Sequence, residues 1–165
     1  MRLAVYTDYV YRRSGGSIYA DRAFALFLGR LSEELDGFLI AGKVDKAPGP
    51  ARYPLSPDTE FVELPYYVNL TRPWAASSAM ARSLIVFWRL LEGVDGVWLL
   101  GPHPLALAFA VLAVARGKSV ALGVRQDFPY YVRARHPGRR WTHVSADVLE
   151  GCWRLLATRV PMVAV

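Results

Sequence analysis

The chain has 165 residues, the length of one domain at the usual ~100–200 residues per domain. Hydrophobic residues make up 53% and charged residues 21%, which is enough for a full core and excludes a disordered or low-complexity chain. The 20 basic and 14 acidic residues give a formal net charge of +6, which favours an anionic partner: nucleic acid, an anionic membrane surface or a phosphorylated small molecule. The single cysteine, Cys152, excludes a disulfide framework and any multi-cysteine metal site.

No segment has the pattern of a membrane span or a signal peptide. The longest apolar run, Pro104–Ala115, has 12 residues, whereas a spanning helix needs about 20. A strand-like pattern begins at Leu3 and meets Asp8, which leaves no room for a signal peptide. We therefore expect a soluble, cytoplasmic protein.

The first 41 residues predict a strand, a loop, a helix and a second strand. Leu3–Thr7 is a short apolar run typical of a buried parallel strand, and Phe38–Ala41 is a second one. Between them, Ser17 is a candidate N-cap and Gly37 a candidate stop for one helix. The helix's apolar face comprises Ala20, Phe24, Phe27, Leu28, Leu31 and Leu35.

The middle of the chain predicts a loop, a weaker strand and a second helix. Residues 43–60 are rich in proline and aspartate and are expected to form a loop, and Phe61–Leu64 is a third strand. An exposed, aromatic connection is expected from Pro65 to Ala76. Ser77 or Ser78 then caps a helix. Its apolar positions are Met80, Leu84, Phe87, Trp88 and Leu91.

The last third repeats the alternation of strand and helix. Gly96–Leu100 is a fourth strand, and Ser119–Val124 a fifth. The helix between them begins at Pro104 and is capped by Gly117; since it is apolar nearly all round, we expect it to be packed on several sides. After a polar segment to Arg140 come an amphipathic helix that includes Val148, Leu149, Cys152, Trp153 and Leu156, and a sixth strand, Pro161–Val165.

Strands that alternate with helices predict an α/β fold: a Rossmann-like parallel sheet with helices on both faces and the strand order 3-2-1-4-5-6. Ligands of such sheets bind beyond the carboxyl ends of the strands, where the order reverses. In this chain that point is the junction of strands one and four. The loop after strand one carries Gly15 and Gly16, and the loop after strand four carries His103.

Gly15 and Gly16 have two interpretations. Placed before a helix N-terminus, their N–H groups and the helix dipole would favour a phosphate. Alternatively, they form a tight turn that needs positive φ. Neither G-x-G-x-x-G nor G-x-x-x-x-G-K-[ST] occurs, so the dinucleotide and P-loop motifs are absent.

The other candidates also have structural alternatives. His103, between two prolines, could donate a hydrogen bond to a sugar or could cap its helix. Asp127, with Arg125 and Gln126, could accept sugar hydroxyls or cap the next helix, and Asp8 has the same ambiguity. The sequence has no Ser-His-Asp order, no H-E-x-x-H and no paired-carboxylate motif.

A basic and aromatic segment follows strand five. It contains Arg133, Arg135, Arg139 and Arg140 among Tyr130, Tyr131 and Trp141. Such a run can be a solvated face, or it can rest on an anionic lipid surface together with Tyr66, Tyr67 and Trp74. We expect no nucleic-acid partner, because no known nucleic-acid module accompanies the charge.

Two stretches resemble the N-terminal domain of a GT-B glycosyltransferase of the family 4 (glycosyl transferase group 1) type. Ser14–Leu31 is similar to the family's Gly-Gly loop and long helix, and Gly96–Asp127 to its strand, His-containing turn, Ala/Leu-rich helix and next strand. The usual Gly-His-Glu-Val junction after the first helix is missing, and Arg125-Gln-Asp127 replaces a histidine-bearing turn.

The resemblance implies that residues 1–165 are one Rossmann-like domain, the acceptor-side half of a glycosyltransferase that uses a nucleotide-sugar and no metal. It implies that Gly15 and Gly16 face the donor pyrophosphate and that His103, the candidate catalytic residue, lies near the transferred sugar. From their positions after strands one and five, we also predict that Asp8, Arg125 and Asp127 contact substrate. The acceptor would be a glycan, a lipid or a small molecule, with possible peripheral contact at the inner face of the membrane. The donor domain would lie outside this chain, so the chain alone should be inactive. The alternative is a non-catalytic Rossmann-like binding or scaffold domain whose basic surface holds an anionic partner.

Overall fold

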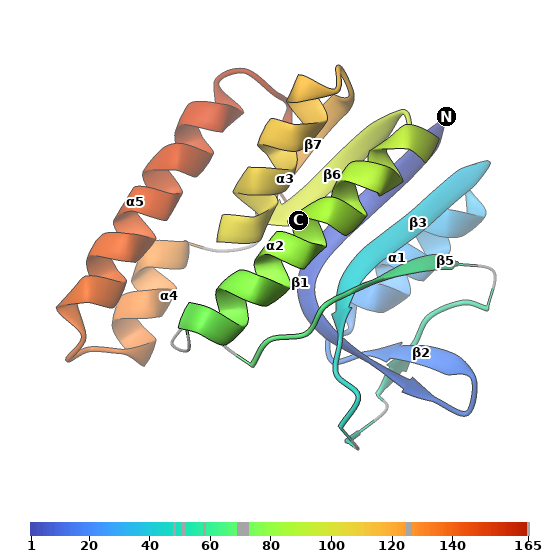
Figure 1. The fold of residues 1–165 in the computed structure, drawn as a ribbon, viewed down its shortest axis with the longest axis horizontal. Coiled ribbons are helices and arrows are strands. Elements are labelled where there is room, and N and C mark those ends of the chain that lie inside the picture. The colour runs from blue at the N-terminus through green and yellow to red at the C-terminus, as the bar shows by residue number, and fades with distance from the viewer. Residues whose placement is uncertain (48, 51, 58, 69–72, 125–126, 165) are drawn as a thin grey trace.

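A computed structural model describes residues 1–47, 49–50, 52–57, 59–68, 73–124 and 127–164 (Figure 1). Within these residues it has one mixed sheet of eight strands with helices on both faces. The strands are β1 (Arg2–Ser14), β2 (Ser17–Ala20), β3 (Gly37–Val44), β4 (Tyr53–Pro54), β5 (Glu60–Leu64), β6 (Gly96–Gly101), β7 (Ser119–Val124) and β8 (Met162–Ala164). The helices are α1 (Phe24–Glu33), α2 (Pro73–Leu90), the 3₁₀ turn η1 (Leu91–Gly93), α3 (Pro104–Ala115), α4 (Phe128–Arg135) and α5 (Arg140–Ala157).

Six parallel strands form the body of the sheet in the order β5-β3-β1-β6-β7-β8. This is the predicted order 3-2-1-4-5-6, which the structure confirms. Leu3 of β1 lies beside Phe38 of β3 on one side and beside Gly96 of β6 on the other. The chain therefore reverses direction across the sheet at β1 and β6, and this junction is the switch point of the fold.

The first strand is longer than predicted. It passes Thr7 with a shift of register between Tyr6 and Val10 and continues to Ser14, where the chain turns back as the antiparallel strand β2. Ser14 pairs with Ser17 across the turn, and β4 pairs with β2 at the outer edge. The sequence analysis does not predict this hairpin.

The prediction that Gly15 and Gly16 lie before a helix is wrong. They form the two-residue turn of the hairpin, with φ values of +56° and +83°. Positive φ at both central residues is the geometry that hairpin turns favour and that Gly-Gly supplies without steric cost. Ser17, the expected N-cap, is instead the first residue of β2, and α1 begins at Phe24.

One other helix boundary differs from expectation, and one helix was not predicted. The helix α2 begins at Pro73, one turn before Ser77 and Ser78. The polar segment after strand five contains an unpredicted helix, α4, which begins after Asp127. By contrast, α3 begins at Pro104 as predicted, and Gly117, with φ +66°, lies just past its C-terminus.

The sheet separates two cores. Helices α2, α3 and α5 cover the face seen in Figure 1, and α1 covers the opposite face. Because the sheet, α2 and α5 occupy three sides of α3, one side of this apolar helix remains open, and Val111 and Val114 there are exposed. The expectation that α3 is packed on several sides therefore holds for all but its outer face.

Candidate functional site

A pocket of about 540 Å³ lies at the switch point, beyond the carboxyl end of β6 and beside Asp8 and Tyr9 of β1, just after the last pairing of β1 with β6 at Tyr6. Its volume is in the range of ordinary small-molecule sites. Four segments line it: β1, the residues between β2 and α1, the loop after β6, and α4. The lining residues are Asp8, Tyr9, Asp21, Arg22, Gly101, Pro102, Phe128, Tyr131 and Arg135.

Gly101 belongs to both the pocket and the core. It ends β6, and a Cβ built on it would come within 2.6 Å of the ring of Trp153 on α5. Trp153 is fully buried. The absence of a side chain at Gly101 thus lets α5 pack against the strand end that forms one wall of the pocket.

His103, the candidate catalytic residue, is buried behind this wall. It is the N-cap of α3, and its Nδ1 accepts a hydrogen bond of 3.2 Å from the N–H of Leu105. The Tyr6 hydroxyl lies 3.2 Å from Nδ1, and the Tyr67 hydroxyl 3.1 Å from Nε2. These contacts agree with the interpretation of His103 as the cap of its helix.

These contacts fix the tautomer of the imidazole. Since Nδ1 accepts from a backbone N–H, it carries no proton, so the proton is on Nε2, which donates to the Tyr67 hydroxyl. The Tyr6 hydroxyl lies within hydrogen-bond distance of Nδ1 and also hydrogen-bonds to the Tyr67 hydroxyl. Burial lowers the pKa of His103 to about 4, against a smaller opposing effect of the Asp8 carboxylate. The ring is therefore neutral near pH 7.

A buried lysine completes this group. Lys43, near the end of β3, is 7% exposed, and its Nζ lies 4.6 Å from the centre of the Tyr67 ring. Burial lowers the pKa of Lys43, and Asp8 again acts in the opposite direction. Burial also raises the pKa of the Tyr67 hydroxyl. We call Tyr6, Lys43, Tyr67 and His103 the His103 cluster.

Tyr67 was expected on an exposed aromatic connection, and for this residue that expectation is wrong. It is 5% exposed, because it packs against Ala76, Ala79 and Met80 of α2, and its hydroxyl is used in the cluster. Trp74 agrees with the expectation, since it is 88% exposed.

Asp8 lines the pocket, as its position directly after the predicted first strand led us to expect. Asp127 does not line this pocket. The Asp127 side chain accepts a hydrogen bond of 2.9 Å from the N–H of Tyr130, so it caps α4. It lines a separate hollow of about 430 Å³ between α4 and α5. Arg125 lies outside the described residues, and substrate contact by either residue remains a prediction.

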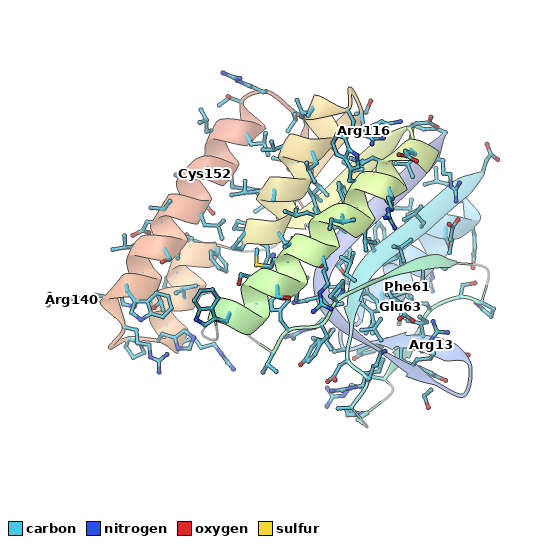
Figure 2. All side chains as sticks on the ribbon, in the orientation of Figure 1. Arg13, Phe61, Glu63, Arg116, Arg140 and Cys152 are labelled. Carbon is cyan, nitrogen blue, oxygen red and sulfur yellow. The ribbon has the colours of Figure 1, made fainter. Side chains whose placement is uncertain are left out.

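Gly15 and Gly16 do not line the pocket. The neighbouring Arg13 pairs with Glu63 of β5 at 2.5 Å, and Figure 2 shows these two side chains together at the β5 side of the sheet. The hairpin therefore leans toward β5, whereas the pocket lies between β1 and β6. The two glycines are exposed, and contact with a donor remains a prediction.

The residues of the basic and aromatic segment lie in different places on the structure. Arg135 and Tyr131 line the pocket, and Arg133 forms an ion pair with Asp147 of α5 at 2.7 Å. Arg140, at the start of α5, points away from the sheet in Figure 2. Trp141 beside it is 56% exposed.

Sequence reasoning missed several pocket residues. Tyr9, Asp21 and Arg22 belong to the extension of β1 and the segment after β2, which were expected to be loop or helix. The Gly-Gly dipeptide between two short runs rich in aromatic and β-branched residues is a hairpin pattern and could have placed them.

No protein-family model matches the chain. No curated protein matches it in sequence. Among solved structures it is similar to a protein assigned as a UDP-N-acetylglucosamine 2-epimerase of Listeria monocytogenes, with 10% identity and a TM-score of 0.45 over 90% of this chain and 38% of that one. The UDP-GlcNAc 2-epimerase of Methanocaldococcus jannaschii gives 17% identity and 0.43 over 90% and 37%. UGT2 of Phytolacca americana, in complex with UDP-2-fluoro-glucose and pterostilbene, gives 12% and 0.47 over 82% and 33%. The chain thus spans 33–38% of the length of these proteins.

Proposed function

We propose that the chain is the acceptor-side half of a GT-B glycosyltransferase of the family 4 type, which transfers a sugar from a nucleotide-sugar to a glycan, lipid or small-molecule acceptor. The observation that carries the proposal is the pocket at the β1/β6 junction, because it lies where open α/β sheets bind ligands and is lined by carboxylates and guanidinium groups. The sequence resemblance of Gly96–Asp127 supports it.

In this proposal Asp8 contacts the acceptor, and His103 is a positioning residue. The buried ring holds the start of α3 and two tyrosines behind the pocket wall. Direct catalysis by His103 would require its ring to leave these hydrogen bonds, and it remains a prediction, as do donor contacts of Gly15 and Gly16. No group of three or more metal-ligating side chains occurs among the described residues, and transfer without a metal is part of the proposal.

The donor site is proposed to lie on a second domain. Calorimetric titration of the 165-residue chain with UDP-glucose, UDP-N-acetylglucosamine and GDP-mannose tests this division. We expect no binding tighter than about 1 mM, about −4 kcal/mol, and no turnover of the nucleotide-sugar. Micromolar binding of any of the three would overturn the acceptor-side assignment.

A non-catalytic domain that holds an anionic partner is the second candidate. The exposed Arg139 and Arg140 favour it. The two candidates differ in what the gene encodes beyond this chain: a glycosyltransferase needs roughly 150–200 further residues with an E-x7-E motif and basic phosphate contacts. A continuous reading frame without them would favour the binding domain.

The location proposed for the protein is the cytoplasm, with peripheral contact at the inner face of the membrane. No helix of the described residues is long and apolar enough to cross a bilayer. The exposed Tyr130 of α4, and the exposed Trp141 that follows Arg139 and Arg140, are suited to the headgroup layer of anionic lipid.

Sedimentation with vesicles tests this contact. We expect binding to phosphatidylglycerol-containing vesicles at low salt, a loss at high salt, and weaker binding of Trp141→Ser. The matched control is Phe27→Ser, since Phe27 is similarly exposed on α1, on the other face of the sheet. Equal binding of the two variants, or none by the parent chain at low salt, would reject the membrane contact.

A further inference from the structure

Acidic and basic side chains occupy different depths of the pocket. Asp8 and Asp21 are half-buried, whereas Arg22 and Arg135 are exposed. The two carboxylates come from β1 and from the segment before α1, and Arg135 is the last residue of α4. A ligand that fills the pocket therefore meets hydrogen-bond acceptors inside and cations at its mouth.

Asp21 offers an acceptor that the described residues leave unused. Its Oδ1 is buried and has no hydrogen-bond partner among them, and its Oδ2 is 3.8 Å from the Nε of Arg22, too long for a hydrogen bond. Buried polar atoms are nearly always paired in folded proteins. The Asp21 side chain is 40% exposed, so a hydroxyl group of a ligand in the pocket can donate to the accessible part of this carboxylate, which only accepts.

Arg135 is the corresponding unused donor. Two residues earlier on α4, Arg133 reaches both carboxylate oxygens of Asp147 at 2.7 Å. Arg135 has no ion pair with any described residue, although it lines the pocket. A planar guanidinium binds phosphate through two parallel hydrogen bonds, so the Arg135 side chain suits a phosphate at the pocket mouth.

We propose that the pocket binds a sugar or polyol phosphate, either as a free molecule or as a lipid headgroup. Its hydroxyl groups donate to Asp8 and Asp21, and its phosphate accepts from Arg135, with Arg22 as a second cation. The proposal deepens the acceptor-side function, on which it rests, by giving the acceptor an anionic group. The pocket of about 540 Å³ has room for a phosphorylated hexose.

The test compares one sugar with and without its phosphate on the 165-residue chain. By NMR titration, we expect glucose 6-phosphate to bind at least tenfold more tightly than glucose or inorganic phosphate. Arg135→Gln should bring the affinity for glucose 6-phosphate down to that for glucose, and Asp21→Asn should weaken both sugars. Arg133→Gln is the matched control and should change none of these affinities, since Arg133 lies on the same helix outside the pocket.

Each outcome has a distinct meaning. Equal affinity for glucose and its 6-phosphate, no binding of either, or equal losses in Arg133→Gln and Arg135→Gln would overturn the anionic-acceptor inference and leave the acceptor-side function standing. Micromolar UDP-glucose binding that Arg135→Gln abolishes would instead overturn the acceptor-side function. If the ligand is a lipid headgroup, the chain should bind phosphatidylglycerol vesicles more tightly than phosphatidylserine vesicles of equal charge, and Asp21→Asn should abolish this binding. If the ligand is a free sugar or polyol phosphate, the chain should show no such preference.

Discussion

The His103 cluster and the pocket lie on two sides of the same strand ends, yet their polar groups are used differently. His103 is 8% exposed, and both of its ring nitrogens have hydrogen-bond partners. In the pocket, Asp21 keeps a buried oxygen without a partner among the described residues, and Arg135 keeps a guanidinium without an ion pair among them. The ring nitrogens of His103 are paired within the protein, whereas the pocket leaves groups available to a ligand.

This difference separates a structural role from a binding role at one sheet edge. A residue at the switch point lies near a bound ligand. If its polar atoms already form hydrogen bonds within the protein, however, they are not available to that ligand. Residues of the cluster should therefore affect stability strongly, and residues of the pocket should affect it little.

The largest effect is expected for His103→Ala. The substitution removes the acceptor of the Leu105 N–H and leaves the hydroxyls of Tyr6 and Tyr67 without this buried partner. A lost cap costs about 1 kcal/mol, and each buried hydrogen bond that the two tyrosines lose about as much again, so the free energy of unfolding should fall by about 3 kcal/mol. Urea unfolding followed by circular dichroism measures it.

The control for this prediction is His103→Asn. The Asn side chain keeps a cap acceptor for α3 but is too short to reach Tyr67, so we expect about half the loss. A loss below about 0.5 kcal/mol in His103→Ala would mean that the cluster does not hold the fold, and a cleft position for His103 would then be the better interpretation.

The pH dependence of stability provides a second test of the cluster. Above pH 6.5 the imidazole is neutral in both the folded and the unfolded chain. Below that pH the unfolded chain binds a proton that the folded chain excludes until its pKa of about 4, so the free energy of unfolding falls as the pH falls between these values. The slope is at most ~1.4 kcal/mol per pH unit.

Chemical unfolding of the parent chain and of His103→Asn at several pH values from 7 to 4.5 isolates this contribution. The plot of unfolding free energy against pH should have a shallower slope for the asparagine variant, because asparagine does not titrate. The titratable groups around the ring, Tyr6, Lys43, Tyr67 and Asp8, are the same in both chains. Parallel slopes would show that His103 takes up no proton on unfolding in this range.

A smaller loss is expected at the hairpin turn. Gly16 has φ +83°, a region that β-branched residues rarely adopt, while a Cβ at this position would have no atom within 4 Å. Gly16→Val should therefore lower the free energy of unfolding by about 1–2 kcal/mol through backbone strain alone. Gly16→Asn should lose clearly less, because asparagine tolerates positive φ; equal losses would point to a contact rather than to strain.

The sheet was predictable because its signals are local and its connections obey general rules. Runs such as Phe38–Ala41 and Gly96–Leu100 are short, apolar and bounded by glycine, and the right-handed crossover rule then limits their order to a few arrangements. The ends of α3 followed from Pro104 and Gly117, which act through their own backbone geometry.

The site was less predictable because it depends on contacts between distant segments. Tyr67 buries His103 from a loop 36 residues earlier, and no local pattern states that pairing. Asp21 and Arg22 reach the pocket only because β1 continues into a hairpin. Asp8 was placed at the site because it directly follows an apolar run.

The smallest effect on stability is expected for Asp21→Asn. This substitution tests most directly whether the pocket differs from the His103 cluster. The Asp21 carboxylate lies 3.8 Å from Arg22 and acts on Lys43 as a smaller opposing effect to burial, and its side chain is 40% exposed, so these charge interactions contribute little. The free energy of unfolding should stay within about 0.5 kcal/mol of the parent chain, while the affinity for glucose 6-phosphate falls. Urea unfolding and NMR titration of the same sample measure both quantities. A stability loss above about 1.5 kcal/mol would place Asp21 with the structural residues, as at His103, and would remove the distinction between the cluster and the pocket.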